Sequence, residues 1–278
     1  MGNRKITLSI FDKQYSAEAT DHKQENCFVC YMDLLGTCSN IQRGVDKEFL
    51  DGLCCVLDIC KQIQHDKQRL KIKTFSDNIC LFYSTSDDLQ QARADFVDFF
   101  NIVSIFQLML FVATAELVRG GIAAGRGLCE DALVWGDALT RAASMEESNE
   151  NKYPRIAIDK ESCAPYMSDT AANYLLRNEK GLPYLDFFAF AQGANDAEAL
   201  QATQQRLVEK IKRTFRTGND IKGDVLAKLR WFVRFCNLKA RQLGRDDLIL
   251  EASFKTPDGN EISLFAEEIT NGKTTEKK

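Results

Sequence analysis

The sequence predicts an α+β protein of ferredoxin-like arrangement, with helices packed on one face of an antiparallel-rich central sheet. Apolar runs of strand length and segments of helical periodicity alternate in the order strand, helix, strand, strand, helix, strand, helix, strand. A tight turn separates two of the strands, as in a β-hairpin. The pattern changes near residue 196, and the two helical segments that follow predict a C-terminal helical appendage.

The first elements are the clearest. Residues 28–32 are apolar throughout and end at Asp33, which predicts a buried strand. Residues 46–66 place their apolar side chains on one broad face at helical spacing. Strands are then expected at 70–75 and 79–83, on either side of the turn.

The middle of the chain continues with a long helix at 88–117 and a glycine-bearing strand at 118–125. A helix is expected at 137–148, followed by short strands at 155–158 and 184–190.

Two helices are expected at 197–216 and 221–243, where apolar residues recur at helical spacing. The stretch 248–268 is compatible with a hairpin or a helix. The polar tail from residue 271 is expected to be disordered.

Composition excludes some function classes. The 278 residues carry a net charge of −4, which argues against general nucleic-acid binding because phosphate contacts need a basic surface. The apolar stretch 96–118 is long enough to span a membrane. Polar residues recur in it every three positions, at Asp98, Asn101, Ser104 and Gln107, which predicts a core helix and no membrane segment.

Ten cysteines are present, and the first residues lack the apolar run of a signal peptide. We therefore expect reduced thiols and a cytoplasmic protein. Cys27 and Cys30 have CxxC spacing, but residues three apart in a strand point to opposite faces, so we interpret them as core cysteines.

Two acidic residues at strand ends carry the functional argument. Asp33 ends the first buried strand, and Asp77 lies in the predicted hairpin turn. Either one alone is expected in a helix cap or a turn. Two carboxylates on adjacent strands can share two divalent cations, which align a hydroxyl and a phosphate for in-line displacement.

With the segment 118–147, which reads VRGGIAAGRGLCEDALVWGDALTRAASMEE, these residues resemble the catalytic domain of class III nucleotidyl cyclases. The metal motif F-x-D-I-x-G-F of that family reads YMDLLGT here, and the K-x-x-G-D hairpin reads KTFSD. The R-x-G-I-x-x-G strand matches 119–125, and the Y-G-x-x-V-N-x-A-x-R-x-E segment is partly present as WGDALTRAASME. The YPRI run at 153–156 and the KLRWFVRFCN run at 228–237 are similar to small bacterial cyclases, in particular the pyrimidine cyclases of Pycsar anti-phage systems.

The resemblance divides the chain into an N-terminal extension (1–26), a cyclase catalytic domain (27–192) and the C-terminal appendage with its tail (193–278). It implies a homodimer with active sites at the interface, and two divalent cations, Mg²⁺ or Mn²⁺. The metal ligands it implies are Asp33, Leu34 and Asp77.

The substrate implied is a nucleoside triphosphate. Backbone amides near Gly36 and Thr37, beside Leu34, would bind its phosphates. Lys73 and Leu133 fall on the two positions that read the base. A donor-only lysine without the usual aspartate favours the acceptor-rich uracil, so we expect UTP ahead of CTP.

The catalytic segment departs from the family. The asparagine and arginine that stabilise the transition state fall on Thr140 and Ser144, and Arg141 lies one residue away from the expected position. The missing cation is then supplied by another residue, for which Arg119 and Arg126 are candidates, or catalysis is impaired. The alternatives are an adenylate cyclase, a degenerate cyclase fold that binds a nucleotide or a partner without turnover, and a structural protein.

Overall fold

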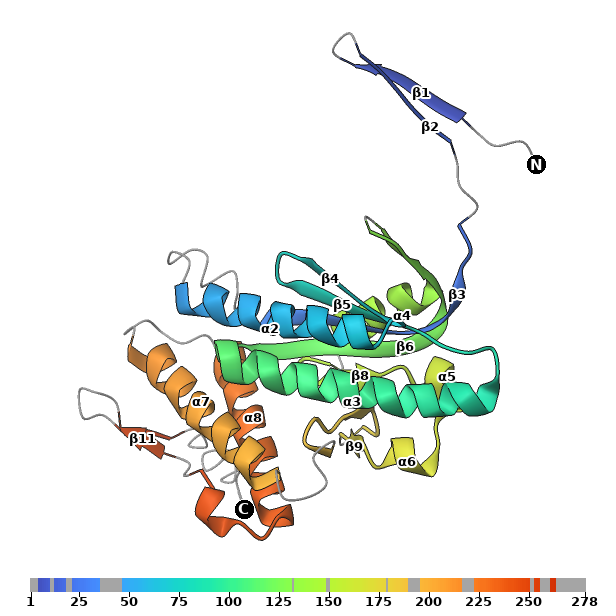
Figure 1. Ribbon diagram of the computed structural model, residues 1–278. Helices are drawn as coiled ribbons and strands as arrows, with labels where there is room; N and C mark the ends of the chain where they lie inside the picture. Colours follow the sequence, from blue (N-terminus) through green and yellow to red (C-terminus); the bar gives the residue numbers. More distant parts are fainter. Residues whose placement is uncertain are drawn as a thin grey trace, which may run out of the picture.

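The computed structural model describes residues 5–10, 13–18, 22–35, 47–131, 133–148, 151–178, 180–189, 196–216, 223–250, 253–255 and 261–263. Within these ranges the protein is a mixed α/β structure built on a sheet of mostly antiparallel strands (Figure 1). The sheet has eight strands in the order β4-β5-β3-β6-β8-β10-β9, with β7 paired to β6. Their bounds are β3 (Glu25–Leu35), β4 (Leu70–Phe75), β5 (Asn78–Ser84), β6 (Leu117–Cys129), β7 (Val134–Gly136), β8 (Ile156–Ile158), β9 (Leu175–Arg177) and β10 (Pro183–Leu185).

The sheet is antiparallel except where β6 pairs with β8 in parallel. The central strand β3 lies between β5 and β6, antiparallel to both. The antiparallel-rich sheet predicted from the sequence is confirmed, and it places the ends of β3, β5 and β6 together.

Helices cover both faces of the sheet, so the expectation that they lie on one face is wrong. Helices α2 (Lys47–Asp66) and α3 (Leu89–Thr114) share one apolar cluster with alternate residues of β3, among them Phe28 and Cys30. Helix α4 (Asp137–Glu147) packs on the opposite face, against the other set of β3 residues. Because β3 is apolar on both faces, it needs a helical layer on each side.

Helix α4 approaches the sheet closely because β6 carries glycine beneath it. A Cβ atom on Gly121 would lie 2.2 Å from the backbone oxygen of Ala142. Glycine in a strand lets a neighbour approach closely, and here that neighbour is the backbone of α4.

Cys27 and Cys30 lie in the two different clusters, as expected for strand residues three apart. All nine cysteines in the described part of the chain are free thiols.

Some boundaries differ from those expected. Helix α3 ends at Thr114, because Ala115 adopts a left-handed conformation with φ 57° and its N–H bonds back to Phe111. The strand expected at 184–190 is limited to β10, since Phe187 and Phe188 turn away into an apolar cluster. The short strand β9, which pairs with β10, was not expected.

Helix α3 is long and apolar enough to cross a membrane by length and composition alone, and no other helix of the described ranges meets that test. It packs against β3 and β6, with α7 and α2 beside it. Of its predicted polar stripe, Asp98 pairs with Lys67 and Asn101 accepts a hydrogen bond from the Tyr174 hydroxyl.

Two small antiparallel hairpins lie outside the sheet. Strands β1 (Lys5–Ile10) and β2 (Lys13–Glu18) pair with each other and stand apart from the main body in Figure 1. Strands β11 (Ser253–Lys255) and β12 (Glu261–Ser263) form the second hairpin. It lies within the stretch 248–268, for which the sequence was compatible with either a hairpin or a helix. The tail from residue 271 lies outside the described residues.

Helices α7 (Asp196–Arg216) and α8 (Gly223–Gln242) form near the two ranges expected for C-terminal helices. They share an apolar cluster with α3 and with the ends of β3 and β6, formed in part by Phe111, Leu200, Leu207, Leu229, Phe232 and Val233. The division of the chain into a catalytic domain and a separate appendage stays a prediction.

Candidate active site

The two acidic residues singled out by the sequence lie at neighbouring strand ends. Asp33 is near the end of β3, where its register partners are Asn78 on β5 and Arg119 on β6. Asp77 lies in the two-residue turn between β4 and β5, in which Ser76 has φ 56°. The amide of Leu34, next to Asp33, donates to the backbone oxygen of Asp77 at 3.0 Å. This backbone bond ties the hairpin turn to the end of β3.

The surroundings of Asp33 disfavour the ionised form of its carboxyl. Burial is the main reason that the pKa of the Asp33 carboxyl is raised to about 6, and the negative charges of Glu146 and Asp77 add to it. Arg119 and Lys228 act in the opposite direction. A bound cation would relieve this repulsion, so the acidic pair has the electrostatics of a metal site.

Hard divalent cations fit this donor set, which consists of two carboxylates and the adjacent Leu34 carbonyl. Among the residues that the structure describes, no group of three or more His, Cys, Asp or Glu side chains is arranged to hold a metal. A metal at this position would then take two side-chain ligands from the described residues, with backbone oxygen, water and substrate phosphate completing its shell.

Arg119 is already engaged. Its Nε donates to Glu146 Oε1 at 2.5 Å, and its guanidinium lies 3.8 Å from the Asp33 carboxylate. Glu146, in the last turn of α4, is almost fully buried. Arg119, one of the two candidates for the missing cation, thus lies beside Asp33. The carboxylate of Glu146, on helix α4, holds it there.

Lys73 and Leu133, the predicted base-reading residues, come from neighbouring loops and strands. Lys73, on β4, donates from Nζ to the backbone oxygen of Asp131 at 3.1 Å. Leu133 and Asp131 are both exposed in the connection between β6 and β7. The structure brings Lys73 to this connection, where Asp131, two residues before Leu133, is its direct partner.

The predicted catalytic residues of α4 point elsewhere. The Thr140 hydroxyl donates to the Gly136 carbonyl at 3.2 Å, and the Ser144 hydroxyl donates to the Thr140 carbonyl at 2.9 Å. Arg141 lies 3.6 Å from Asp159. No described contact joins Thr140 or Arg141 to the acidic pair of the same chain.

Thr140 lines a surface pocket of ≈ 690 Å³ together with Arg126 and Trp135. Trp135 is 64% exposed, which is unusual for its type. Arg126 donates to the Gln24 backbone oxygen at 2.8 Å. An exposed aromatic ring, a guanidinium and a hydroxyl make a surface that could contact the base or ribose of a nucleotide held by another subunit.

Gly36 and Thr37, the predicted phosphate-binding positions, lie outside the described residues.

Sequence reasoning missed two residues near Asp33. Glu146 is the last letter of the WGDALTRAASME segment, so its match to the family motif could have identified it. Lys228 begins the KLRWFVRFCN run, but its approach to Asp33 depends on how α8 packs. No sequence pattern could have indicated that approach.

Comparisons with known proteins give structural neighbours only. No protein-family profile matches the chain, and no curated protein matches it in sequence. The structure resembles the adenylyl cyclase CyaB from P. aeruginosa, with 16% identity and a TM-score of 0.45 over 60% of this chain and 95% of that one. It also resembles the monomeric guanylyl cyclase domain of the RhoGC fusion protein from Blastocladiella emersonii, with 17% identity and a TM-score of 0.42 over 59% and 96%.

A bacterial light-regulated adenylyl cyclase is a further neighbour, with 15% identity and a TM-score of 0.39 over 67% of this chain and 57% of that one. The structural neighbours are thus adenylyl and guanylyl cyclase domains. TM-scores and sequence identities this low do not establish a shared activity. A function has to be argued from the residues of this chain.

Proposed function

We propose that this chain is a nucleotidyl cyclase, which converts a nucleoside triphosphate to its 3′,5′-cyclic mononucleotide and pyrophosphate. The observation that carries the proposal is the pairing of Asp33 and Asp77 at adjoining strand ends, locked by the bond from Leu34 to the Asp77 carbonyl. Like charges are kept close there, and burial raises the pKa of the Asp33 carboxyl to about 6. A protein keeps such a costly pair where a cation is to be bound.

The chain's own residues would hold the reactants. Asp33, Asp77 and the Leu34 carbonyl would hold Mg²⁺ or Mn²⁺, which lowers the pKa of the ribose 3′-hydroxyl and offsets the charge of the departing pyrophosphate. The 3′-hydroxyl gives its proton to solvent water and its oxygen forms a bond to the α-phosphorus. The bond from that phosphorus to the oxygen bridging to the β-phosphate breaks, and pyrophosphate leaves. Holding these atoms in line supplies much of the rate, since positioning can contribute about 7–11 kcal/mol.

Glu146 has a positioning role in this proposal. Its carboxylate holds the Arg119 guanidinium beside Asp33. Arg119 is thereby kept at the acidic pair, close enough to approach a phosphate bound there.

The active site is proposed to be completed by a second copy of the chain. Thr140, together with Arg126 and Trp135, lines an exposed pocket and has no described contact with the acidic pair of its own chain. A homodimer would place that pocket of one subunit against Asp33 and Asp77 of the other.

For the base we propose uracil ahead of cytosine. Lys73 Nζ uses one hydrogen for the Asp131 carbonyl, which leaves two donors for carbonyl oxygens of a base. The exposed Leu133 offers no acceptor for the exocyclic amine of adenine. The further proposal that the product is an anti-phage signal, made in the cytoplasm, rests on the sequence resemblance alone.

An adenylate cyclase is the second candidate, and one contact favours it. Asp131 is exposed beside Lys73, so its carboxylate could accept from an exocyclic amine as the family's aspartate does. Purified protein supplied with Mn²⁺ and equal UTP, CTP, ATP and GTP decides between the two. We expect mainly cyclic UMP by mass spectrometry; mainly cyclic AMP would show that Asp131 reads the base.

A further inference from the structure

Arg119 can act at the acidic pair only if its guanidinium is held in place, because a free arginine side chain samples many rotamers. Its Nε and Nη2 atoms both contact the Glu146 carboxylate, and Nη2 also lies 3.8 Å from the Asp33 carboxylate. Arg119 lies near the start of β6, and Glu146 lies in the last turn of α4. The place of the guanidinium therefore depends on how these two elements are fixed to each other.

A buried amide joins them. Asn151 has no exposed surface, and its Nδ2 donates to the Gly120 carbonyl at 2.8 Å and to the Met145 carbonyl at 3.2 Å. Gly120 follows Arg119 in the chain, and Met145 precedes Glu146. The two hydrogens of one amide thus bond the residue next to each member of the Arg119–Glu146 pair.

Gly120 is bonded to the segment 151–155 through both of its backbone groups. Its N–H donates to the Arg155 carbonyl at 3.1 Å, while its carbonyl accepts from Asn151. Arg155 Nε donates to Asn151 Oδ1 at 3.2 Å, which closes a ring of three hydrogen bonds. Because a guanidinium can only donate, it fixes which end of the amide is the oxygen, and Nδ2 must face the two carbonyls.

Arg155 is itself held firmly. Only 3% of it is exposed, and its guanidinium lies 5.7 Å from the ring centroid of Tyr153 and 5.3 Å from that of Tyr184. These are cation–π distances. Tyr153 in turn stacks on Trp231 of α8, with 6.0 Å between centroids. The YPRI and KLRWFVRFCN runs therefore meet at this point and support the ring of hydrogen bonds around Gly120.

We propose that Asn151 is a positioning residue, which holds the Arg119–Glu146 pair beside Asp33 so that the Arg119 guanidinium meets a phosphate bound there. This inference deepens the proposed cyclase function and rests on it. The arginine that α4 lacks at Ser144 is then replaced by a cation on β6, and the segment that follows α4 sets its place.

A buried asparagine that bonds backbone carbonyls also serves stability, and this simpler role predicts a different result. If Asn151 were only structural, its loss would reduce the amount of folded protein and leave Arg119 unchanged in the molecules that remain folded. If Asn151 positions Arg119, its loss frees the guanidinium in folded molecules.

The test uses the full-length protein and the substitution Asn151→Asp. This change keeps the size of the side chain and the acceptor for Arg155, but it places an oxygen against the two carbonyls. The matched control is Asn237→Asp on α8. Asn237 is also buried and bonds the Leu250 backbone through both ends of its amide, at 3.1 and 2.9 Å.

Nuclear magnetic resonance measures how fast the Arg119 Nε–H exchanges with water in the metal-free protein, well below the melting temperature. The signal is identified by its loss in Arg119→Lys. We expect exchange about tenfold faster in Asn151→Asp than in the wild type, because the bond to Glu146 is weakened, and no change in Asn237→Asp. Equal rates in the wild type and Asn151→Asp would overturn the inference. So would a wild-type rate as fast as that of exposed arginines.

Turnover of the preferred triphosphate with Mn²⁺ gives the second measurement. We expect kcat to fall about tenfold in Asn151→Asp, and the same change to add little further loss in an Arg119→Lys background, since both act through one guanidinium. Losses that multiply in full would show a purely structural role and overturn the inference.

If Asn151→Asp does not fold, Asn151→Ala is measured in its place, with Asn237→Ala as its control. A wild type that forms no cyclic nucleotide, while Arg119 exchange still rises in Asn151→Asp, would refute the cyclase function. It would leave intact the placement of Arg119 by Asn151.

Discussion

Asp33 carries a carboxylate at a position where its negative charge is unfavourable. Asp33 is partly buried and lies near two other acids, and its pKa is raised to about 6. An ordinary aspartate has a pKa of about 3.9 in an unfolded chain. Between these values the folded state binds more protons than the unfolded state, so the stability of the metal-free protein falls as pH rises.

Replacing Asp33 by Asn should therefore stabilise the metal-free protein while abolishing turnover. At pH 8 the variant should gain up to about 3 kcal/mol in free energy of unfolding, because ionisation of Asp33 no longer opposes folding. Below about pH 4 the gain should vanish, since the carboxyl is protonated in both states. Urea unfolding in EDTA at several pH values measures it.

Mn²⁺ provides the complementary measurement. It should raise the melting temperature of the wild type and leave that of Asp33→Asn unchanged, because only the wild type has both carboxylates. Asp58→Asn, at an exposed acid of α2, is the control and should respond to Mn²⁺ as the wild type does. A gain for Asp33→Asn that is the same at every pH would contradict the electrostatic explanation.

At the scale of elements, the close packing of α4 on β6 depends on glycine. Gly121→Ala should destabilise the protein by about 1–3 kcal/mol, because the new Cβ would meet the Ala142 oxygen at 2.2 Å. Gly223→Ala, at a position with no neighbour within 4 Å, should be neutral or slightly stabilising. Thermal melting of both variants tests the contrast, and equal effects would show that α4 is free to move away from the sheet.

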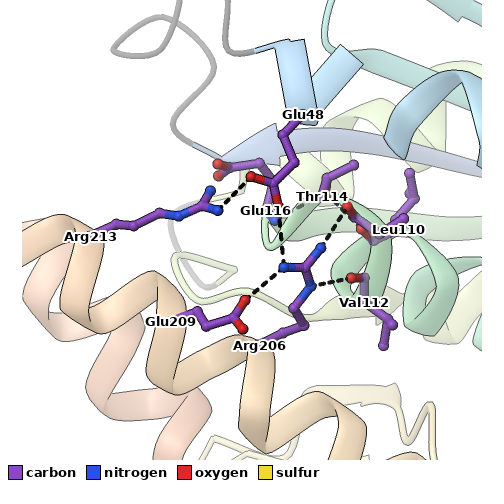
Figure 2. Close-up of polar contacts among 9 residues, drawn as sticks. Glu48, Leu110, Val112, Thr114, Glu116, Arg206, Glu209 and Arg213 are labelled. Carbon is purple, nitrogen blue, oxygen red and sulfur yellow. Dashed lines mark hydrogen bonds and ion pairs between the residues drawn. The ribbon is translucent and has the colours of Figure 1, made fainter. Parts of the chain in front are cut away.

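The attachment of α7 can be tested in the same way. Arg206→Ala removes the bonds to the last carbonyls of α3 and to Glu48, shown in Figure 2. We expect a loss of about 1–3 kcal/mol in the free energy of unfolding, because partly buried backbone acceptors lose a charged donor. Lys212→Ala, an exposed change on the same helix, should have little effect. No loss in Arg206→Ala would mean that the remaining contacts of α7, among them the Arg213–Glu48 ion pair and the apolar cluster, hold it without Arg206.

The elements that could be predicted are those with local causes. The hairpin that carries Asp77 follows from two apolar runs around a two-residue turn, and α2 follows from its apolar face. The end of α3 could not be predicted, because Ala115 takes a left-handed conformation without glycine. The position of α4 on the second face of the sheet also depends on tertiary packing, since an apolar strand accepts a layer on either side.

The candidate site was predictable to a similar extent. Asp33 and Asp77 were identified from their places at strand ends, and the structure brings those ends together. Arg141 lies 3.6 Å from Asp159 of its own chain, about 100° around α4 from Thr140, and its part in catalysis stays a prediction. Lys228 lies nearly two hundred residues from Asp33 in the sequence, and only the packing of α8 relates them.

In the whole molecule, each active site is proposed to need residues from two subunits. Asp33→Ala and Lys73→Ala proteins should each be inactive alone, because one lacks a metal ligand and the other a base ligand. The resemblance to class III cyclases implies that Asp33 and Lys73 of one site come from different subunits. Mixed dimers should therefore regain part of the activity, since one of the two interfaces then has both residues intact. Assays across mixing ratios measure it. A fully active protein that remains monomeric at assay concentration would contradict the shared site.

Metal-dependent cyclisation by Asp33 and Asp77 can be tested in one assay. Wild type and Asp77→Asn are incubated with UTP, CTP, ATP and GTP, with Mn²⁺ or with EDTA, and the products are identified by mass. We expect a 3′,5′-cyclic nucleotide and pyrophosphate from the wild type with Mn²⁺, and neither product with EDTA or from a folded Asp77→Asn. A wild type that forms no cyclic nucleotide from any of the four, or an Asp77→Asn protein of full activity, would contradict it.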